Sequence, residues 1–106
     1  MAFQISREMD GEAALITLSG ELDASTAPFF RDEIEKAAAE KPERLVLILK
    51  DLEYMASAGL RVLIFARQKM GSDVDIYMIA PQEQVRSTLE KTGFLYSVIV
   101  QDMYPG

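Results

Sequence analysis

The stretch "RLVLILKDLEYMASAGLRVLI", residues 44–64, decides the fold because a strand pattern passes directly into a helix pattern. Its five consecutive apolar residues, 45–49, are typical of a strand buried on both faces, as in a parallel sheet. Helical periodicity follows over 57–70. Ser57 stands at the junction between the two patterns, which makes it the first residue to examine for function.

Outside this stretch, apolar periodicity and turn residues predict alternating strands and helices. Asp10-Gly11 is a strong signal for a two-residue hairpin turn at the beginning of the chain. Such alternation favours a largely parallel sheet with crossover helices, opened by an N-terminal hairpin. The expected elements, in order, are strands over 3–9 and 13–20, a helix near Pro28, a strand over 44–52, helices over 57–70 and 81–93 on either side of a strand over 73–80, and a short strand over 96–100.

Composition narrows the function class. The 106 residues suit one compact domain, with 3–100 as its core and 101–106 as a loose tail. No apolar run approaches the roughly 18 residues that span a bilayer, so neither a membrane span nor a signal sequence is expected. With no cysteine, a disulfide framework and a thiolate metal site are ruled out, and a cytoplasmic protein is the expectation. The net charge of −6, without a dense basic run, argues against a nucleic-acid partner.

Catalysis by a serine nucleophile is disfavoured. The chain has no histidine, so a Ser-His-Asp triad cannot form. Met55 stands where the esterase nucleophile elbow requires glycine. No phosphate-binding or dinucleotide-binding glycine loop is present, and no metal or other cofactor is expected. We therefore do not expect an enzyme.

Two interpretations of Ser57 remain. It could cap the helix, with its hydroxyl accepting the backbone N–H of Gly59 or Leu60. Alternatively, it could be a phosphoacceptor, because a helix N-terminus stabilises a phosphate and the flanking Ala56 and Ala58 leave the hydroxyl open. Gly59 could serve the close approach of a partner or nucleotide, or close packing of the helix on the sheet.

Read together, three stretches resemble the STAS domain family, and more narrowly the bacterial anti-sigma factor antagonists. They are "SGELDASTA" from residue 19, "LVLILKDLEYMASAGLRVLI" from residue 45 and "IAPQEQVRSTLEKTGF" from residue 79. The resemblance covers roughly residues 3–100. It rests on a combination of motifs: Gly-Glu-Leu-Asp, Asp-Leu before the serine loop, Ser-Ala-Gly-Leu, and Thr-Gly at the end of the last helix.

The resemblance implies a partner switch. Such an antagonist binds an anti-sigma factor that is itself a GHKL-type serine kinase, and this releases the sigma factor. The kinase phosphorylates the loop serine, which ends binding, and a PP2C-type phosphatase restores it. Ser57 matches the phosphoacceptor and Asp23 a residue beside it. The expected partner-binding residues are Asp23, Met55, Ala56, Ser57, Ala58, Gly59, Leu60 and Arg61.

This sequence departs from the family pattern at several points. Ala56 and Ala58 stand where many members have polar residues, so Ser57 is the only hydroxyl in the loop. The family commonly ends with a further helix, and this chain stops soon after the last strand. The less covered face would favour self-association as a homodimer or a different partner surface. These departures keep two alternatives open: a STAS adaptor in another signalling or transport complex that is not phosphorylated, and a module that binds a small ligand or nucleotide.

Overall fold

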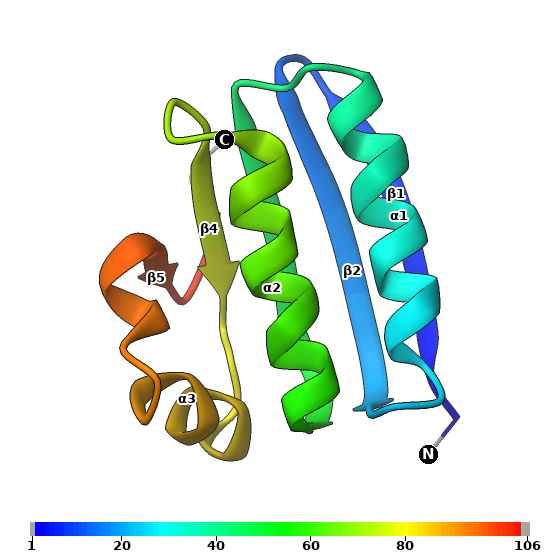
Figure 1. The fold of residues 1–106 in the computed structure, drawn as a ribbon, viewed down its shortest axis with the longest axis vertical. Coiled ribbons are helices and arrows are strands. Elements are labelled where there is room, and N and C mark those ends of the chain that lie inside the picture. The colour runs from blue at the N-terminus through cyan, green and yellow to red at the C-terminus, as the bar shows by residue number, and fades with distance from the viewer. Residues whose placement is uncertain (1, 105–106) are drawn as a thin grey trace.

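The computed structural model describes residues 2–104 as three α-helices, a short 3-10 helix and five strands. The elements follow the predicted order, with the short 3-10 helix added before the last strand (Figure 1). Along the chain they are β1 Gln4–Asp10, β2 Ala13–Leu22, α1 Ala27–Ala39, β3 Arg44–Met55, α2 Ser57–Met70, β4 Asp75–Ile79, α3 Glu83–Glu90, η1 Phe94–Ser97 and β5 Ile99–Gln101.

The five strands form one mixed sheet in the order β1-β2-β3-β4-β5. β1 pairs antiparallel with β2, and all other neighbours are parallel. The hairpin turn is formed by Gly11 and Glu12, one residue later than predicted, because Asp10 still pairs with Ala13. The predicted fold class, a mostly parallel sheet opened by a hairpin and joined by crossover helices, is therefore confirmed. β3 is the longest strand and lies at the centre of the sheet.

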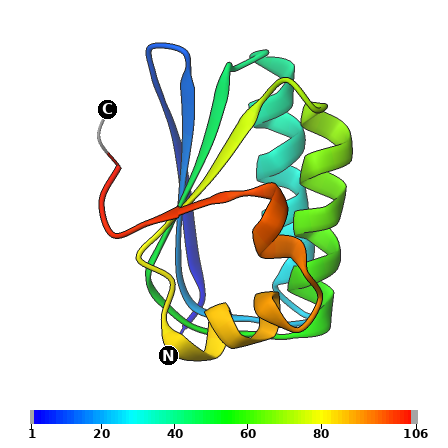
Figure 2. The same cartoon turned by 90° about the vertical axis from the view of Figure 1, so that its left-hand side faces the viewer.

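The apolar run of β3 is buried on both faces, as its sequence predicts. Leu45, Leu47 and Leu49 join the main core under α1 and α2, which cover one face of the sheet (Figures 1 and 2). Val46 belongs to a smaller cluster on the opposite face, with half-buried Ile48 packed against it. In Figure 2 the C-terminal segment crosses that opposite face.

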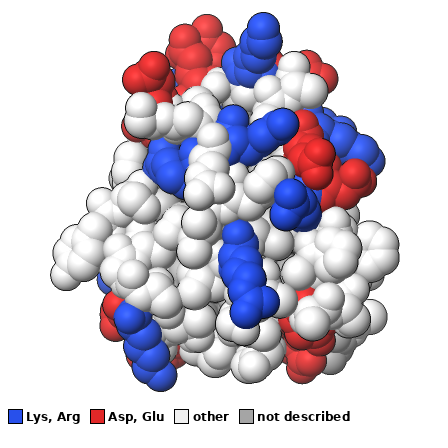
Figure 3. Space-filling view, in the orientation of Figure 1, with Lys and Arg blue, Asp and Glu red and all other residues white. Residues whose placement is uncertain are grey.

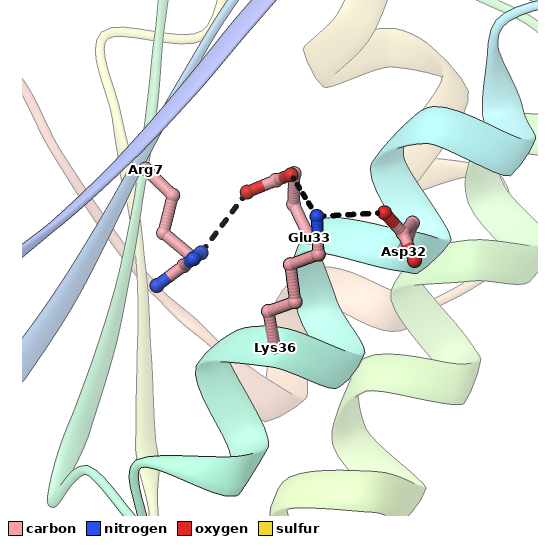
Figure 4. Close-up of polar contacts among 4 residues, drawn as sticks. All are labelled: Arg7, Asp32, Glu33 and Lys36. Atoms are coloured by element: carbon pink, nitrogen blue, oxygen red, sulfur yellow. Dashed lines mark hydrogen bonds and ion pairs between the residues drawn. The ribbon is translucent and has the colours of Figure 1, made fainter.

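Ionic contacts add to the packing of α1 beside β1. The Arg7 Nε lies 3.0 Å from the Glu33 Oε1, and the Lys36 Nζ bridges Asp32 at 3.0 Å and Glu33 at 3.5 Å (Figure 4). The hydrogen bond to Asp32 is the main reason why the pKa of Lys36 is raised. Ion pairs that are accessible to water are screened by it and contribute little to stability. The orientation of α1 therefore depends mainly on the burial of its apolar face.

Several boundaries near the C-terminus differ from the prediction. α3 begins at Glu83 rather than at Pro81, because Gln82 has an extended conformation and caps the helix. Tyr96 and Ser97, predicted to begin the last strand, lie instead in η1.

The segment predicted as a loose tail makes specific contacts. Gln101 closes β5. The ring of Tyr104 packs edge-on against Tyr77, with centroids 5.4 Å apart, and its hydroxyl accepts a 3.0 Å hydrogen bond from the Arg44 Nε. The last two residues of the predicted tail, Pro105 and Gly106, lie outside the described range.

Candidate functional site

The loop between β3 and α2 presents Ser57 as the first residue of a helix. β3 continues to Met55, and Ala56 takes an extended conformation, with φ −89° and ψ 173°, as the helix cap. The Ala56 carbonyl accepts the N–H groups of Gly59 at 3.0 Å and Leu60 at 3.2 Å. Ser57 is exposed and makes no capping hydrogen bond through its side chain.

The capping interpretation of Ser57 is therefore wrong. The N–H groups of Gly59 and Leu60 bond to the backbone carbonyl of Ala56 instead of a hydroxyl, because Ala56 is the cap and the helix begins at Ser57, one residue earlier than a serine cap would require. The N–H groups of Ser57 and Ala58 precede the first helical hydrogen bond and carry the partial positive charge of the helix N-terminus.

Asp23 lies in the turn that meets this loop from β2. The Ala56 N–H donates a 2.8 Å hydrogen bond to the carbonyl of Leu22, the last residue of β2. Directly after it, the Asp23 Oδ1 accepts hydrogen bonds from the Ser25 hydroxyl at 2.7 Å, the Ser25 N–H at 2.9 Å and the Thr26 N–H at 3.2 Å. The bonds to Asp23 fix its turn. The bond from Ala56 to Leu22 makes this turn and the Ser57 loop adjoining segments.

We expect Ser25→Ala to raise the pKa of Asp23. In the folded protein this pKa is lowered, chiefly because the Ser25 hydroxyl donates a hydrogen bond to the carboxylate. A lowered folded pKa gives stability that is present above the unfolded value, about 3.9, and is lost as the pH falls through the folded value. Titration of the Asp23 carboxyl carbon by NMR would measure the change. An unchanged pKa would mean that the two backbone N–H groups and the Thr26 hydroxyl hold the charge without the Ser25 hydroxyl.

The predicted partner-binding residues divide into a surface group and a buried group. Met55 is only 1% exposed, and Gly59 is also buried, so neither presents a side chain at the surface. The other six lie at the surface or partly exposed: Asp23, Ala56, Ser57, Ala58, Leu60 and Arg61.

Gly59 has a packing role. A Cβ built at this position would lie 2.6 Å from the Leu22 Cδ2, 2.8 Å from the Leu22 Cγ and 3.1 Å from the Met55 Cγ. These distances are shorter than van der Waals contact, so only glycine lets α2 approach the ends of β2 and β3 this closely. Of the two interpretations of this glycine, the structure supports close packing.

A shallow groove of about 280 Å³ runs beside Ser57 between the N-terminal ends of α1 and α2. Its floor is apolar, and Arg31 and Arg61 stand at its sides. The Arg31 guanidinium also stacks over the Phe65 ring, 3.9 Å from its centroid, which fixes its position. Figure 3 shows that most charged side chains on this face gather toward the other end of the helices.

Two residues that contact the last part of β3 were not found from the sequence, and of these only Gln84 bonds next to the Ser57 loop. The Gln84 Oε1 accepts the Met55 N–H at 2.8 Å, and the Gln82 Nε2 donates to the Lys50 carbonyl at 2.8 Å. Their helix lies at the same end of the sheet as the Ser57 loop (Figure 1). The sequence carries no signal for these contacts, because the strands predicted over 44–52 and 73–80 are similar in length.

Other kinds of site are not supported by the described part of the chain. Within residues 2–104, no group of three or more acidic, histidine or cysteine side chains could hold a metal ion. Nor is any helix in that range long and apolar enough to cross a membrane.

Comparison with known proteins agrees with this geometry. The family model of the STAS domain matches residues 4–105. The chain is 30% identical to the anti-sigma-F factor antagonist RsfB of Mycobacterium tuberculosis over 91 residues. This alignment covers 81% of this chain and 75% of RsfB.

Solved structures show the same fold. An anti-sigma factor antagonist from Mycobacterium paratuberculosis superimposes with a TM-score of 0.85 at 26% identity, covering 99% of this chain and 87% of that one. The antagonist SpoIIAA in its unphosphorylated form gives a TM-score of 0.78 over 93% of this chain and 87% of its own, and its 21% identity establishes the shared fold only.

Proposed function

Because the chain belongs to the STAS domain family, we propose that it is an anti-sigma factor antagonist controlled by phosphorylation of Ser57. RsfB and the Mycobacterium paratuberculosis protein are antagonists of this kind, which supports the first half of the proposal. The partner is an anti-sigma factor of the GHKL kinase type, and binding to it releases a sigma factor. This is a binding function in the cytoplasm, not a catalytic one.

The observation that supports the phosphoswitch is that the Ser57 hydroxyl, at the first position of α2, is exposed and makes no capping hydrogen bond. A serine that capped the helix would have to give up its capping bond when modified. Ser57 has no such bond to lose, and a phosphate at this position would face the free N–H groups of the first turn. The fold can therefore accept the modification without rearrangement.

The transfer itself is chemically simple. The Ser57 Oγ attacks the γ-phosphorus of ATP, the bond from that phosphorus to the bridging oxygen breaks, and ADP leaves. The hydroxyl proton passes to a base on the kinase. Hydrolysis of the phosphoserine by a PP2C-type phosphatase, with water as the nucleophile, restores the hydroxyl and releases phosphate.

The proposed binding surface combines the Ser57 loop with the groove beside it. Ala58 and Leu60 follow the serine in the first turn of α2, Asp23 lies in the adjoining turn, and Arg61 lines the groove between α1 and α2. Small side chains around Ser57 let a kinase approach the hydroxyl closely. Met55 and Gly59 support this surface from beneath instead of contacting the partner.

The test is an intact mass and peptide map of the protein after incubation with ATP and a lysate of its host. We expect one added phosphoryl group, located on Ser57 and absent from Ser57→Ala. Phosphorylation of a related antagonist in the same lysate would show that the lysate contains active kinase. If that related antagonist is modified and this protein is not, the phosphoswitch is wrong, and a STAS adaptor that binds its partner constitutively becomes the better description.

A further inference from the structure

The edge of β3 that faces β4 is only partly covered by a strand. β4 pairs with β3 from Arg44 to Ile48, but β3 continues to Met55. Beyond Ile48, the backbone groups that point toward β4 must find other partners, because buried N–H and C=O groups are almost always hydrogen-bonded. Met55 is the critical case, since it is fully buried and lies two residues before Ser57.

Gln84 of α3 provides that partner, and its orientation is determined by its neighbours. Its Oε1 accepts the Met55 N–H at 2.8 Å, and its Nε2 donates to the Thr88 Oγ1 at 3.2 Å and, at 3.4 Å, to the Met55 carbonyl. The Thr88 hydroxyl donates its one proton to the backbone carbonyl of Gln84 at 3.0 Å. It can therefore only accept a hydrogen bond from the side-chain amide of Gln84. The amide nitrogen must therefore face Thr88, which leaves the oxygen for Met55.

The next residue is held from the opposite side. The Ala56 N–H donates to the Leu22 carbonyl at 2.8 Å, as expected for an extended chain whose successive amides point to opposite edges. Gln84 and Leu22 thus hold the two residues before Ser57 from both edges of β3. Ala56 in turn provides the carbonyl that begins α2.

We propose that Gln84 is a positioning residue for Ser57, acting through the Met55 N–H. This inference rests on the proposed function, because it assigns a role in presenting the phosphoacceptor to its kinase. Without Gln84, the end of β3 would be held from one edge only, and the hydroxyl would occupy a wider range of positions. Misplacement of about 1 Å can slow a transfer reaction by roughly a hundredfold.

Three variants separate positioning from general stability. Gln84→Leu keeps the approximate size but removes the acceptor. Gln84→Glu keeps an oxygen for the Met55 N–H but loses the donor to Thr88 and the weaker, 3.4 Å bond to the Met55 carbonyl. Gln82→Leu is the matched control, because it removes a glutamine bond to the same edge of β3, at Lys50, farther from Ser57.

Each variant would be measured for exchange of the Met55 amide hydrogen, for melting temperature, and for the rate of Ser57 phosphorylation with ATP and host lysate. For Gln84→Leu we expect exchange at least about tenfold faster and phosphorylation roughly tenfold slower, with a melting temperature within a few degrees of that of the wild type. Gln84→Glu should restore most of the phosphorylation rate, and Gln82→Leu should leave it unchanged.

The outcomes distinguish this inference from the proposed function. Absence of phosphorylation in the wild-type protein overturns the phosphoswitch and, with it, the role assigned to Gln84. Phosphorylation of the wild type and of Gln84→Leu at equal rates overturns the positioning role alone. Equal losses in all three variants would show that the α3 contact acts only through stability, which also overturns it.

Discussion

Ser57→Asp is expected to weaken binding to the anti-sigma factor more than about a hundredfold, whereas Ser57→Ala preserves it. An interface that closes over the start of α2 would have to remove water from the new carboxylate, and Asp23 in the adjoining turn would repel it. A penalty of about 3 kcal/mol corresponds to this loss of affinity. Titration calorimetry with the purified anti-sigma factor would measure it.

Ser57→Asp should lower the affinity for the anti-sigma factor without lowering the melting temperature. A carboxylate in the first turn of a helix is favourable, so Ser57→Asp should melt at the same temperature as the wild type or slightly higher. Ser6→Asp, on the exposed side of β1, adds the same charge away from the site and should bind normally. Equal affinities for Ser57→Asp and Ser57→Ala would contradict the switch mechanism.

Gly59→Ala is expected to destabilise the protein by about 2 kcal/mol. In an exposed helix the same change stabilises by up to about 1 kcal/mol, so the sign of the effect is itself a test. The new methyl carbon would lie 2.6 Å from the Leu22 Cδ2 and 3.1 Å from the Met55 Cγ, and α2 would have to move away from the strand ends. Urea unfolding of the purified variant would give the free energy.

A second substitution tests whether contact with Leu22 causes the loss of stability in Gly59→Ala. In a Leu22→Ala background the two closest atoms to the added methyl group are absent, so Gly59→Ala should cost much less. A double-mutant cycle would then show a coupling energy of about 1 kcal/mol or more between the two positions. Additive effects would mean that the penalty comes from elsewhere in the helix.

The fold could be predicted from the sequence because its main signals are local. The apolar run at residues 45–49, the Asp10-Gly11 turn and the periodicity of 57–70 each indicate one element, and β3 and α2 begin where the patterns place them. The last strand was less predictable. Tyr96 and Ser97 have the composition of a strand, but the chain forms a 3-10 turn there before it reaches the sheet edge beside β4.

The site was only partly predictable, because its details depend on contacts between distant segments. Ser57 and its exposure follow from the local pattern. The burial of Met55 does not, since the sequence gives no indication of how far β3 extends. The contact of Gln84 with Met55 joins residues 29 positions apart, and no periodicity reports such a pairing.

The sequential order of the strands has a consequence for synthesis on the ribosome. Each strand pairs with the one made just before it, so a nascent chain can extend the sheet at one edge as it emerges. The Ser57 loop is held in place later than β3 itself, because Gln84, which bonds to Met55, emerges only after β4 is made. A growing chain would thus hold most of its sheet before it could offer a well-placed serine to a kinase.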